Sequence, residues 1–315
     1  TGDVTNEADN CSTGLQATFS DVTVNGPCQG SHVITRTWSL VDNCGNAAAN
    51  QVQTITVSDN TPPTFTRPAD ITIFTDASCN YDAGVGATGD VTNEADNCST
   101  GLQATFSDVT VNGPCQGSHV ITRTWSLVDN CGNAAANQIQ TITVSDNTPP
   151  TFTRPADTTI FTDADCNYNA SVGTTGDVTN EDDNCSTGLN ATFSDVIADG
   201  PCEGSHVITR TWSLVDNCGN AAANQIQTIT VSDNTPPTFT RPADTRIFTD
   251  ADCNYNAGVG ATGDVTNEAD NCSTGIQATF SEVIADGPCE GSHVITRTCS
   301  LVDNCGNAAA NQIQT

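Results

Sequence analysis

The sequence predicts an all-β protein: a tandem array of immunoglobulin-like antiparallel β-sandwich domains with an 87-residue repeat and disulfide staples. A stretch that begins Ser-His-Val-Ile-Thr-Arg-Thr recurs every 87 residues, starting at Ser31, Ser118, Ser205 and Ser292. Short runs rich in β-branched and aromatic residues alternate with turn residues, and no segment has helical periodicity. About seven such runs fit into one period, which is typical of a small sandwich domain and too long for a solenoid repeat.

We place the junctions between domains at the motif Asp-Asn-Thr-Pro-Pro, which occurs at 59–63, 146–150 and 233–237. Strand pairing has to stop there because two consecutive prolines cannot donate ladder hydrogen bonds. The predicted domains are a partial copy at 1–58 that lacks its first strands, complete copies at 59–145 and 146–232, and a copy at 233–315 with a truncated last strand. We refer to them as the first to fourth copies.

In the first half of the second copy, Phe65 is expected to anchor the core. The alternating segment Asp-Ile-Thr-Ile-Phe-Thr-Asp, at 70–76, predicts a half-buried strand. A turn around Cys79 then leads into another strand, and the polar segment 88–98 is typical of a loop.

In the second half of the copy, the segment 102–111 predicts a strand with a bulge, because its apolar positions change phase after Phe106. The segment 118–145 predicts a long hairpin. Its turn, Asp-Asn-Cys-Gly-Asn, contains Gly132, which can adopt a positive φ.

The cysteines recur at fixed places, which indicates disulfides and an extracytoplasmic location. In the second copy, Cys115 and Cys131 flank a strand of about ten residues and would lie roughly 30 Å apart, whereas a disulfide needs Cα atoms within about 7 Å. The expected sandwich topology places Cys79 and Cys115 at one end of the domain and Cys98 and Cys131 at the other. We therefore expect the pairs Cys79–Cys115 and Cys98–Cys131.

Applied to every copy, this pairing predicts disulfides at Cys11, Cys44, Cys79, Cys115, Cys98, Cys131, Cys166, Cys202, Cys185, Cys218, Cys253, Cys289, Cys272 and Cys305. Cys28 is expected to be unpaired because its partner would precede residue 1. Cys299 is the odd thiol of the fourth copy and replaces the Trp that the other copies carry, such as Trp125. A buried spare thiol and an intermolecular disulfide both remain open for it. The cysteine spacing does not fit a zinc site.

The chain is strongly acidic, with 37 acidic residues, 8 basic residues and a net charge of −29. Such a field argues against binding to nucleic acid and against association with anionic membranes. It also favours divalent cations, because calcium takes six to eight oxygen ligands from carboxylates, amides and carbonyls. We expect the candidate metal ligands to be Glu94, Asp96, Asp129, Asp146 and Asn147. No other cofactor is expected, and the alternative is that these residues only form turns and caps.

The Asp-x-x-Pro-Pro-x-Phe junction, the Asp-Asn-Cys loop and the Asp-Asn-Cys-Gly-Asn turn resemble hyalin-repeat (HYR-like) immunoglobulin-like domains. The similarity covers the whole repeat and is strongest to the tandem copies in large surface adhesins of Bacteroidetes that are exported by type IX secretion. The early Cys-Pro of that family and its cysteine in the last strand are absent here. The resemblance implies an extracellular, cell-surface adhesive or structural filament.

No nucleophile elbow, phosphate loop or metal-binding histidine set is present, so we do not expect an enzyme. The predicted function is a non-enzymatic extracellular stalk or filament of a cell-surface adhesin, an extended rod of repeated domains. The alternative is a multivalent module that binds glycans or surfaces through its loops. The expected partners are further copies of the repeat in a longer chain, laterally associated chains, and a surface glycan or substratum, with no nucleic acid and no membrane insertion.

Overall fold

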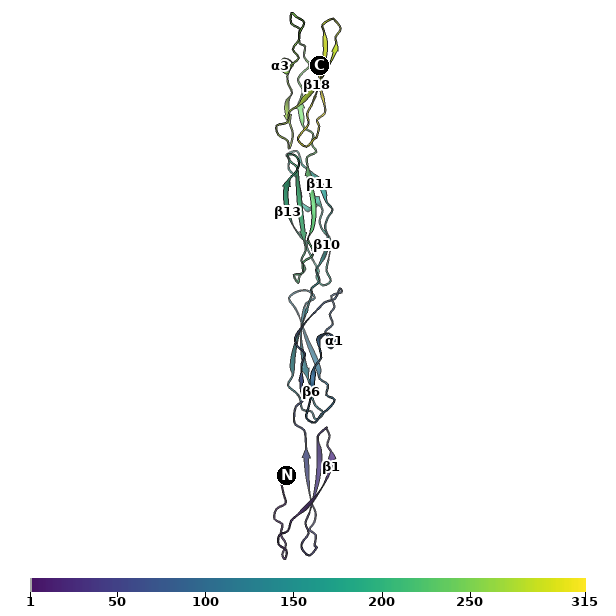
Figure 1. The fold of residues 1–315 in the computed structure, drawn as a ribbon, viewed down its shortest axis with the longest axis vertical. Coiled ribbons are helices and arrows are strands. Elements are labelled where there is room, and N and C mark those ends of the chain that lie inside the picture. The colour runs from purple at the N-terminus through teal and green to yellow at the C-terminus, as the bar shows by residue number, and fades with distance from the viewer. Residues whose placement is uncertain (1) are drawn as a thin grey trace. The chain divides into compact units, whose positions relative to one another are not determined.

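A computed structural model describes residues 2–315 and shows a nearly all-β chain of tandem immunoglobulin-like sandwich domains (Figure 1). The chain divides into two compact units, Thr1–Asn147 and Thr148–Thr315. The first unit holds the first and second copies, and the second unit begins two residues into the third copy. Among the described residues, no helix is long and apolar enough to cross a membrane.

The first copy consists of one antiparallel sheet with strand order β1-β2-β3. Its strands are β1 (Thr18–Asn25), β2 (His32–Ser39) and β3 (Gln51–Val57). No apolar side chain among described residues 2–58 is buried. This copy therefore has one layer of a sandwich and no closed core.

The second copy has both layers. Its elements are β4 (Thr64–Thr66), β5 (Ile71–Phe74), α1 (Val85–Thr88), β6 (Thr92–Ala95), β7 (Thr105–Asn112), β8 (His119–Ser126) and β9 (Gln138–Ser145). The small sheet pairs β4 with β6, and the large sheet has the order β5-β9-β8-β7. Within the large sheet β5 runs parallel to β9, and the other pairs are antiparallel.

The third copy repeats this arrangement, and the fourth repeats part of it. The third contains β10 (Thr151–Thr153), β11 (Thr158–Phe161), α2 (Val172–Thr175), β12 (Thr179–Asp182), β13 (Thr192–Asp199), β14 (His206–Ser213) and β15 (Gln225–Ser232). The fourth contains β16 (Thr238–Thr240), α3 (Val259–Thr262), β17 (Thr266–Ala269), β18 (Thr279–Asp286), β19 (His293–Ser300) and β20 (Gln312–Gln314). In the fourth copy no strand follows β16 at the position of β5 and β11.

Three local expectations were wrong. The polar segment 88–98, expected to be a loop, contains the strand β6. The segment after the Cys79 turn forms a single helical turn, α1, instead of the start of a strand. β7 also has no bulge, because its pairing with β8 continues without a shift from Thr105 to Asn112. The apolar residues change phase because their side chains lie on opposite faces of the sheet. Phe106 packs on Trp125, whereas Val109 lies on the outer face and is exposed.

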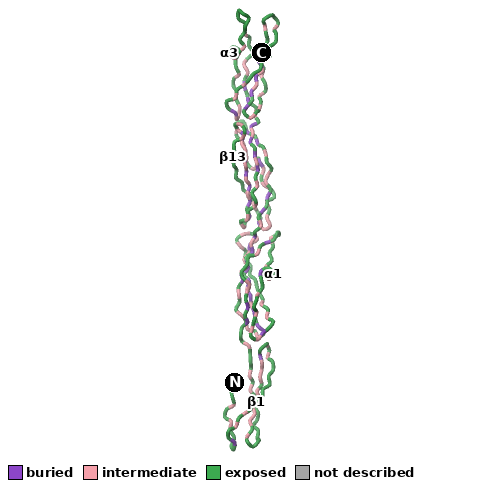
Figure 2. The backbone as a smooth tube through the Cα atoms, in the orientation of Figure 1, coloured by how far each residue is buried: buried purple, intermediate pink, exposed green. Residues whose placement is uncertain are grey.

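The core of each complete copy consists of two apolar clusters. Figure 2 marks the buried residues along the backbone. In the second copy one cluster is Ile121, Ile142 and Val144, with Ile73 and Ala83 packed against it. The other is Phe65, Trp125 and Leu127, with partly buried side chains such as Val91 around it. The predicted anchoring role of Phe65 is confirmed.

A buried guanidinium belongs to the same inner face as these clusters. Arg123 is 1% exposed and forms an ion pair with Asp108 through two hydrogen bonds of 2.8 Å. It also donates to the Thr88 hydroxyl and to the Ala83 carbonyl, and it lies 4.0 Å from the ring centre of Phe106. These contacts tie α1 and its approach segment to the large sheet, because the charge can be buried only when all its donors find acceptors.

Candidate functional site: the junctions between copies

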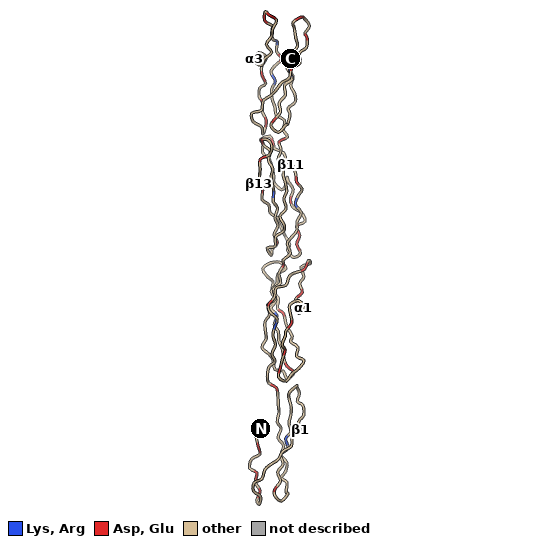
Figure 3. Tube along the Cα trace, in the orientation of Figure 1, with Lys and Arg blue, Asp and Glu red and all other residues tan. Residues whose placement is uncertain are grey.

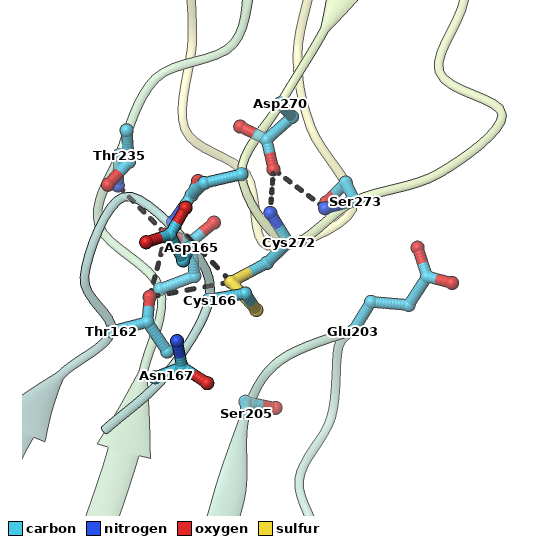
Figure 4. Close-up of a disulfide and its surroundings, with 12 residues drawn as sticks. Thr162, Asp165, Cys166, Asn167, Glu203, Ser205, Thr235, Asp270, Cys272 and Ser273 are labelled. Carbon is cyan, nitrogen blue, oxygen red and sulfur yellow. Dashed lines mark hydrogen bonds between the residues drawn. A yellow bond between two sulfur atoms is a disulfide. The ribbon is translucent and has the colours of Figure 1, made fainter. Parts of the chain in front are cut away.

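The disulfides cross the junctions. In the first unit Cys28 of the first copy is bonded to Cys131 of the second, with Cα atoms 5.1 Å apart. In the second unit two bonds join the third copy to the fourth: Cys166–Cys272, shown in Figure 4, and Cys202–Cys305, with Cα separations of 5.1 and 5.2 Å. These bonds close loops of 103 and 106 residues and fasten one copy to the next.

The predicted pairing within each copy was therefore wrong. Cys28, expected to be unpaired, is bonded, and Cys131 is bonded to it instead of to Cys98. Cys166 and Cys202 bond to the fourth copy and not to each other. The prediction assigned the cysteine loops to the two ends of a domain but treated that domain as isolated. At a junction, the ends of two consecutive copies meet, and the partner that is within reach belongs to the neighbour.

Some of the remaining cysteines are bonded and others are free. Cys79, Cys115, Cys185 and Cys218 are also disulfide-bonded. The free cysteines are Cys11, Cys44, Cys98, Cys253, Cys289 and Cys299, so five residues expected in disulfides carry thiols. Cys299 is buried in the place of the core Trp, and its burial raises the pKa of its thiol.

A polar side chain next to the second disulfide adds hydrogen bonds across the last junction. The Glu203 carboxylate accepts from the backbone N–H of Thr274 at 2.7 Å, from the Thr274 hydroxyl at 2.9 Å and from the Asn304 amide at 2.8 Å. At the first junction Gln29 takes the same role with Thr100 and Asn130. The repeat therefore uses either an acid or an amide at one position to hold the next copy.

Gly204, beside Glu203, permits the close approach of the two copies. Its φ is +76°, and a Cβ at this position would lie 2.6 Å from the sulfur of Cys272 and 2.7 Å from that of Cys166. Glycine is the residue that accepts this backbone conformation and leaves room for the disulfide. The second glycine of the sequence Gly-Pro-Cys-Glu-Gly-Ser, at 200–205, is thus required by the contact between copies as well as by the turn.

Three aspartates meet at the last junction. Asp233 comes from the junction motif, Asp270 from the polar loop and Asp303 from the hairpin turn, and each places one carboxylate oxygen within 4.8 Å of the others. These aspartates also accept hydrogen bonds from backbone N–H groups, which fix the conformation of the loop and the hairpin turn. Asp270 accepts from the N–H groups of Cys272 and Ser273 (Figure 4), and Asp303 accepts from those of Cys305 and Asn307.

The first junction repeats the group with Asp59, Asp96 and Asp129. The structure therefore brings together two of the predicted ligands, Asp96 and Asp129. The third member is Asp59, which lies one period before the expected Asp146. Asp146 ends the last strand of the second copy, where its carboxylate accepts a hydrogen bond from the Thr75 hydroxyl at 3.3 Å.

The other two predicted ligands lie outside this group. The Glu94 carboxylate is used as an acceptor for the backbone N–H of Ala104, and Asn147 is exposed. Sequence reasoning missed Asp59 because it looked for a junction acid that follows a domain. The sequence did contain the information needed to find Asp59. Each junction motif begins with Asp, and it lies at the same end of its own copy as the polar loop and the hairpin turn.

Several oxygens at these junctions are buried and have no hydrogen-bond partner: Asp59 Oδ2, Asp96 Oδ1, Asp233 Oδ2, Asp270 Oδ1 and Asn271 Oδ1. Asp233 is only 3% exposed. Buried carboxylate oxygens without a donor are costly, and like charges at this distance repel. The same field acts on a neighbouring thiol: burial first, and then the charges of Asp59, Asp96 and Asp129, raise the pKa of Cys98. The arrangement offers hard oxygen ligands to a cation.

The acid at position 203 predicts a pH response at the last junction. The Thr274 backbone N–H, the Thr274 hydroxyl and the Asn304 amide hold the pKa of Glu203 below its ordinary value of 4.5. A lowered pKa means that the stabilisation is complete above pH 4.5 and is lost as the pH falls through the folded value. We expect Glu203→Gln, which copies Gln29, to reduce the fall in melting temperature between pH 5 and pH 3. Equal acid sensitivity of the two proteins would contradict this role.

No family model matches the chain, and no curated protein matches it. Solved structures similar to it include the EC1–4 fragment of Drosophila N-cadherin, at 12% identity and a TM-score of 0.25, with 95% of this chain and 91% of that chain covered. Human mucin-like protocadherin EC1–2 gives 10% identity and a TM-score of 0.24 over 54% and 98% of the two chains. The sialic-acid-binding region of a Streptococcus sanguinis adhesin gives 13% identity and a TM-score of 0.17 over 82% and 77%.

Proposed function

We propose that the chain is the stalk of a cell-surface adhesin, a non-enzymatic extracellular array whose copies are fastened covalently to one another. The observation that carries the proposal is the position of the disulfides. Cys28–Cys131, Cys166–Cys272 and Cys202–Cys305 all join consecutive copies. A bond inside a domain protects only that domain, whereas a bond across a junction keeps two domains together under load. The acidic residues, which recur along the chain in Figure 3, add repulsion between neighbouring molecules, and this repulsion opposes aggregation.

Stretching single molecules between their termini tests this role. In the oxidised chain the residues between Cys28 and Cys131, and those between Cys166 and Cys272, cannot extend, and these loops hold 103 and 106 residues. At ~3.4 Å per extended residue, reduction should lengthen the fully unfolded chain by at least roughly 700 Å. The same contour length before and after reduction would contradict the proposal.

The acidic junctions support a second part of the proposed function, in which calcium occupies the three-aspartate groups and stiffens the stalk. Asp233, Asp270 and Asp303 would supply carboxylate oxygens, and Asn271 would add its unpaired amide oxygen. A cation would neutralise the mutual repulsion of the carboxylates and provide partners for the buried oxygens. Because the ligands come from the junction motif, the loop and the hairpin turn, binding would fix the junction motif against the body of the copy that follows it.

Calcium titration followed by calorimetry tests this part. We expect calcium to increase the free energy of unfolding by mass action, by about 2.7 kcal/mol at a concentration 100 times the Kd. The melting temperature should rise accordingly, and chelator should reverse the rise. Asp233→Asn should reduce the number of bound calcium ions by one. Asp252→Asn, which removes an exposed charge in the same copy, is the matched control and should leave the stoichiometry unchanged. If the Asp233→Asn variant binds as many calcium ions as the unmodified chain, calcium does not bind at this group of aspartates.

A further inference from the structure

Two exposed asparagines at the ends of outer strands are each followed by glycine. Asn25 is the last residue of β1 and Asn112 is the last residue of β7, and no other asparagine in the chain precedes a glycine. The third and fourth copies carry Asp199 and Asp286 at this position. The same fold therefore accepts either an amide or a carboxylate at the end of this strand.

The glycine that follows each asparagine is required by packing. A Cβ at Gly26 would lie 2.2 Å from the hydroxyl oxygen of Ser31, and a Cβ at Gly113 would lie 2.2 Å from that of Ser118. A side chain at either position would displace the serine, so the asparagine keeps a neighbour that has none. A backbone nitrogen without an adjacent Cβ can approach the amide carbon of the preceding side chain with little steric hindrance.

We propose that Asn25 and Asn112 are sites of spontaneous deamidation. The Gly26 nitrogen loses its proton to solvent and attacks Cγ of Asn25, the new C–N bond closes a succinimide ring, and the side-chain nitrogen takes up a proton and leaves as ammonia. Water then adds to either carbonyl of the ring and opens it, which gives aspartate or isoaspartate. The same steps apply to Asn112. Each site consumes water and releases ammonia, and no oxidant or reductant takes part.

The turn that follows β1 controls how readily this reaction starts. In the closed turn the Gly26 N–H donates to the Ser31 carbonyl at 2.8 Å, so the attacking nitrogen is already engaged. The Ser31 hydroxyl holds the turn closed by donating to the Cys28 carbonyl and accepting from the Cys28 N–H. Cys28 is itself bonded to Cys131 of the next copy. Reaction therefore requires local opening of the turn, and cleavage of this disulfide makes that opening easier.

The third copy shows how the aspartate product is accommodated. Asp199 pairs with His206 in the same register in which Asn112 pairs with His119. One carboxylate oxygen of Asp199 lies 3.6 Å from Nδ1 of His206. In the second copy, Nδ1 of His119 is buried and has no hydrogen-bond partner. Conversion of Asn112 to aspartate places a carboxylate near this nitrogen and allows an ion pair when the imidazole is protonated.

The isoaspartate product changes the backbone. The main chain then runs through the side-chain methylene and is one carbon longer before Gly26, so the Gly26 N–H cannot reach Ser31 while the strand register is unchanged. The displaced turn carries Gln29, whose amide oxygen accepts from the Thr100 N–H of the second copy at 2.9 Å. Isoaspartate at position 25 therefore weakens a contact across the first junction, whereas aspartate leaves it intact.

Peptide mapping of the full chain by mass spectrometry, after incubation at mildly alkaline pH, tests the proposal. We expect the replacement of the amide by an acid at Asn25 and Asn112, and labelling by an isoaspartyl methyltransferase should reveal isoaspartate at both. Asn50 is the internal control, because it is exposed and is followed by Gln51, whose side chain hinders ring closure. The double variant Asn25→Gln, Asn112→Gln should release no ammonia from these positions, since a glutamine would have to close a larger ring.

Reduction of the disulfides before incubation tests the control by the turn and should accelerate the reaction at Asn25. An unchanged rate at Asn25 would overturn that control. If the folded chain keeps Asn25 and Asn112 intact while the denatured chain loses them, the turns do not open and the proposal is wrong. Equal modification at Asn50 would also contradict it, because the glycine would then have no effect. The proposal does not depend on the role of the chain as a stalk.

Discussion

Replacing Cys202 and Cys305 together by serine is expected to lower the free energy of unfolding of the second unit by roughly 3–5 kcal/mol. The bond closes a loop of 103 residues, and its loss allows the unfolded chain far more conformations. The native junction should keep its shape in this variant, because the bond between Cys166 and Cys272 and the hydrogen bonds of Glu203 remain. Denaturant unfolding followed by circular dichroism measures the change.

The matched control is the pair Cys253→Ser and Cys289→Ser, which removes two exposed free thiols from the fourth copy. This variant should unfold at the same denaturant concentration as the unmodified chain. If the two double variants are equally stable, the disulfides do not constrain the unfolded chain, and the junctions are held only by non-covalent contacts.

Arg123→Met is expected to destabilise the second copy by roughly 1–3 kcal/mol for each buried acceptor that loses its donor, because Arg123 is buried and its partner Asp108 stays accessible to water. Asp108 would lose both of its hydrogen bonds to the guanidinium, and the Thr88 hydroxyl and the Ala83 carbonyl would lose a donor. The loss would also free α1 from the large sheet. Calorimetry of the full chain should show one transition moved to lower temperature.

Arg67→Met is the control for this second prediction. Arg67 forms an ion pair with Asp70, three residues later in the sequence, and both side chains are substantially exposed to solvent. Exposed pairs contribute between about 0 and 1 kcal/mol, so this variant should melt almost unchanged. If the two substitutions lower the melting temperature equally, the burial of Arg123 does not determine how much it contributes to stability.

The sequence was sufficient to predict the fold class. Side-chain type and alternation located the strands that form the large sheet, because Trp125, Ile121 and Ile142 face one side of it. The helical turn α1 could not be foreseen, since four residues are too few to show a helical period and its conformation is held by contacts with Arg123 and Gln140. The apparent bulge in β7 was an edge strand with apolar residues on both faces.

The site was only partly predictable, and the reason is physical. Asp96 and Asp129 were identified as candidate ligands from their acidic loops, but Asp59 was not, since its place depends on how the junction motif folds back on its own copy. The disulfide pairing failed for a related reason. Spacing within one repeat contains no information about which cysteine of the neighbouring copy will come within bonding distance, and only the packing of consecutive copies reveals it.

The central claim is that disulfides join consecutive copies, and the most direct test is to map them in the unreduced protein. Digestion at aspartate followed by mass spectrometry should give linked peptides containing Cys28 with Cys131, Cys166 with Cys272, and Cys202 with Cys305. Reduction should separate each of them. Linked peptides containing Cys166 with Cys202, or Cys272 with Cys305, would place the bonds within single copies and would contradict the account of a covalently fastened stalk.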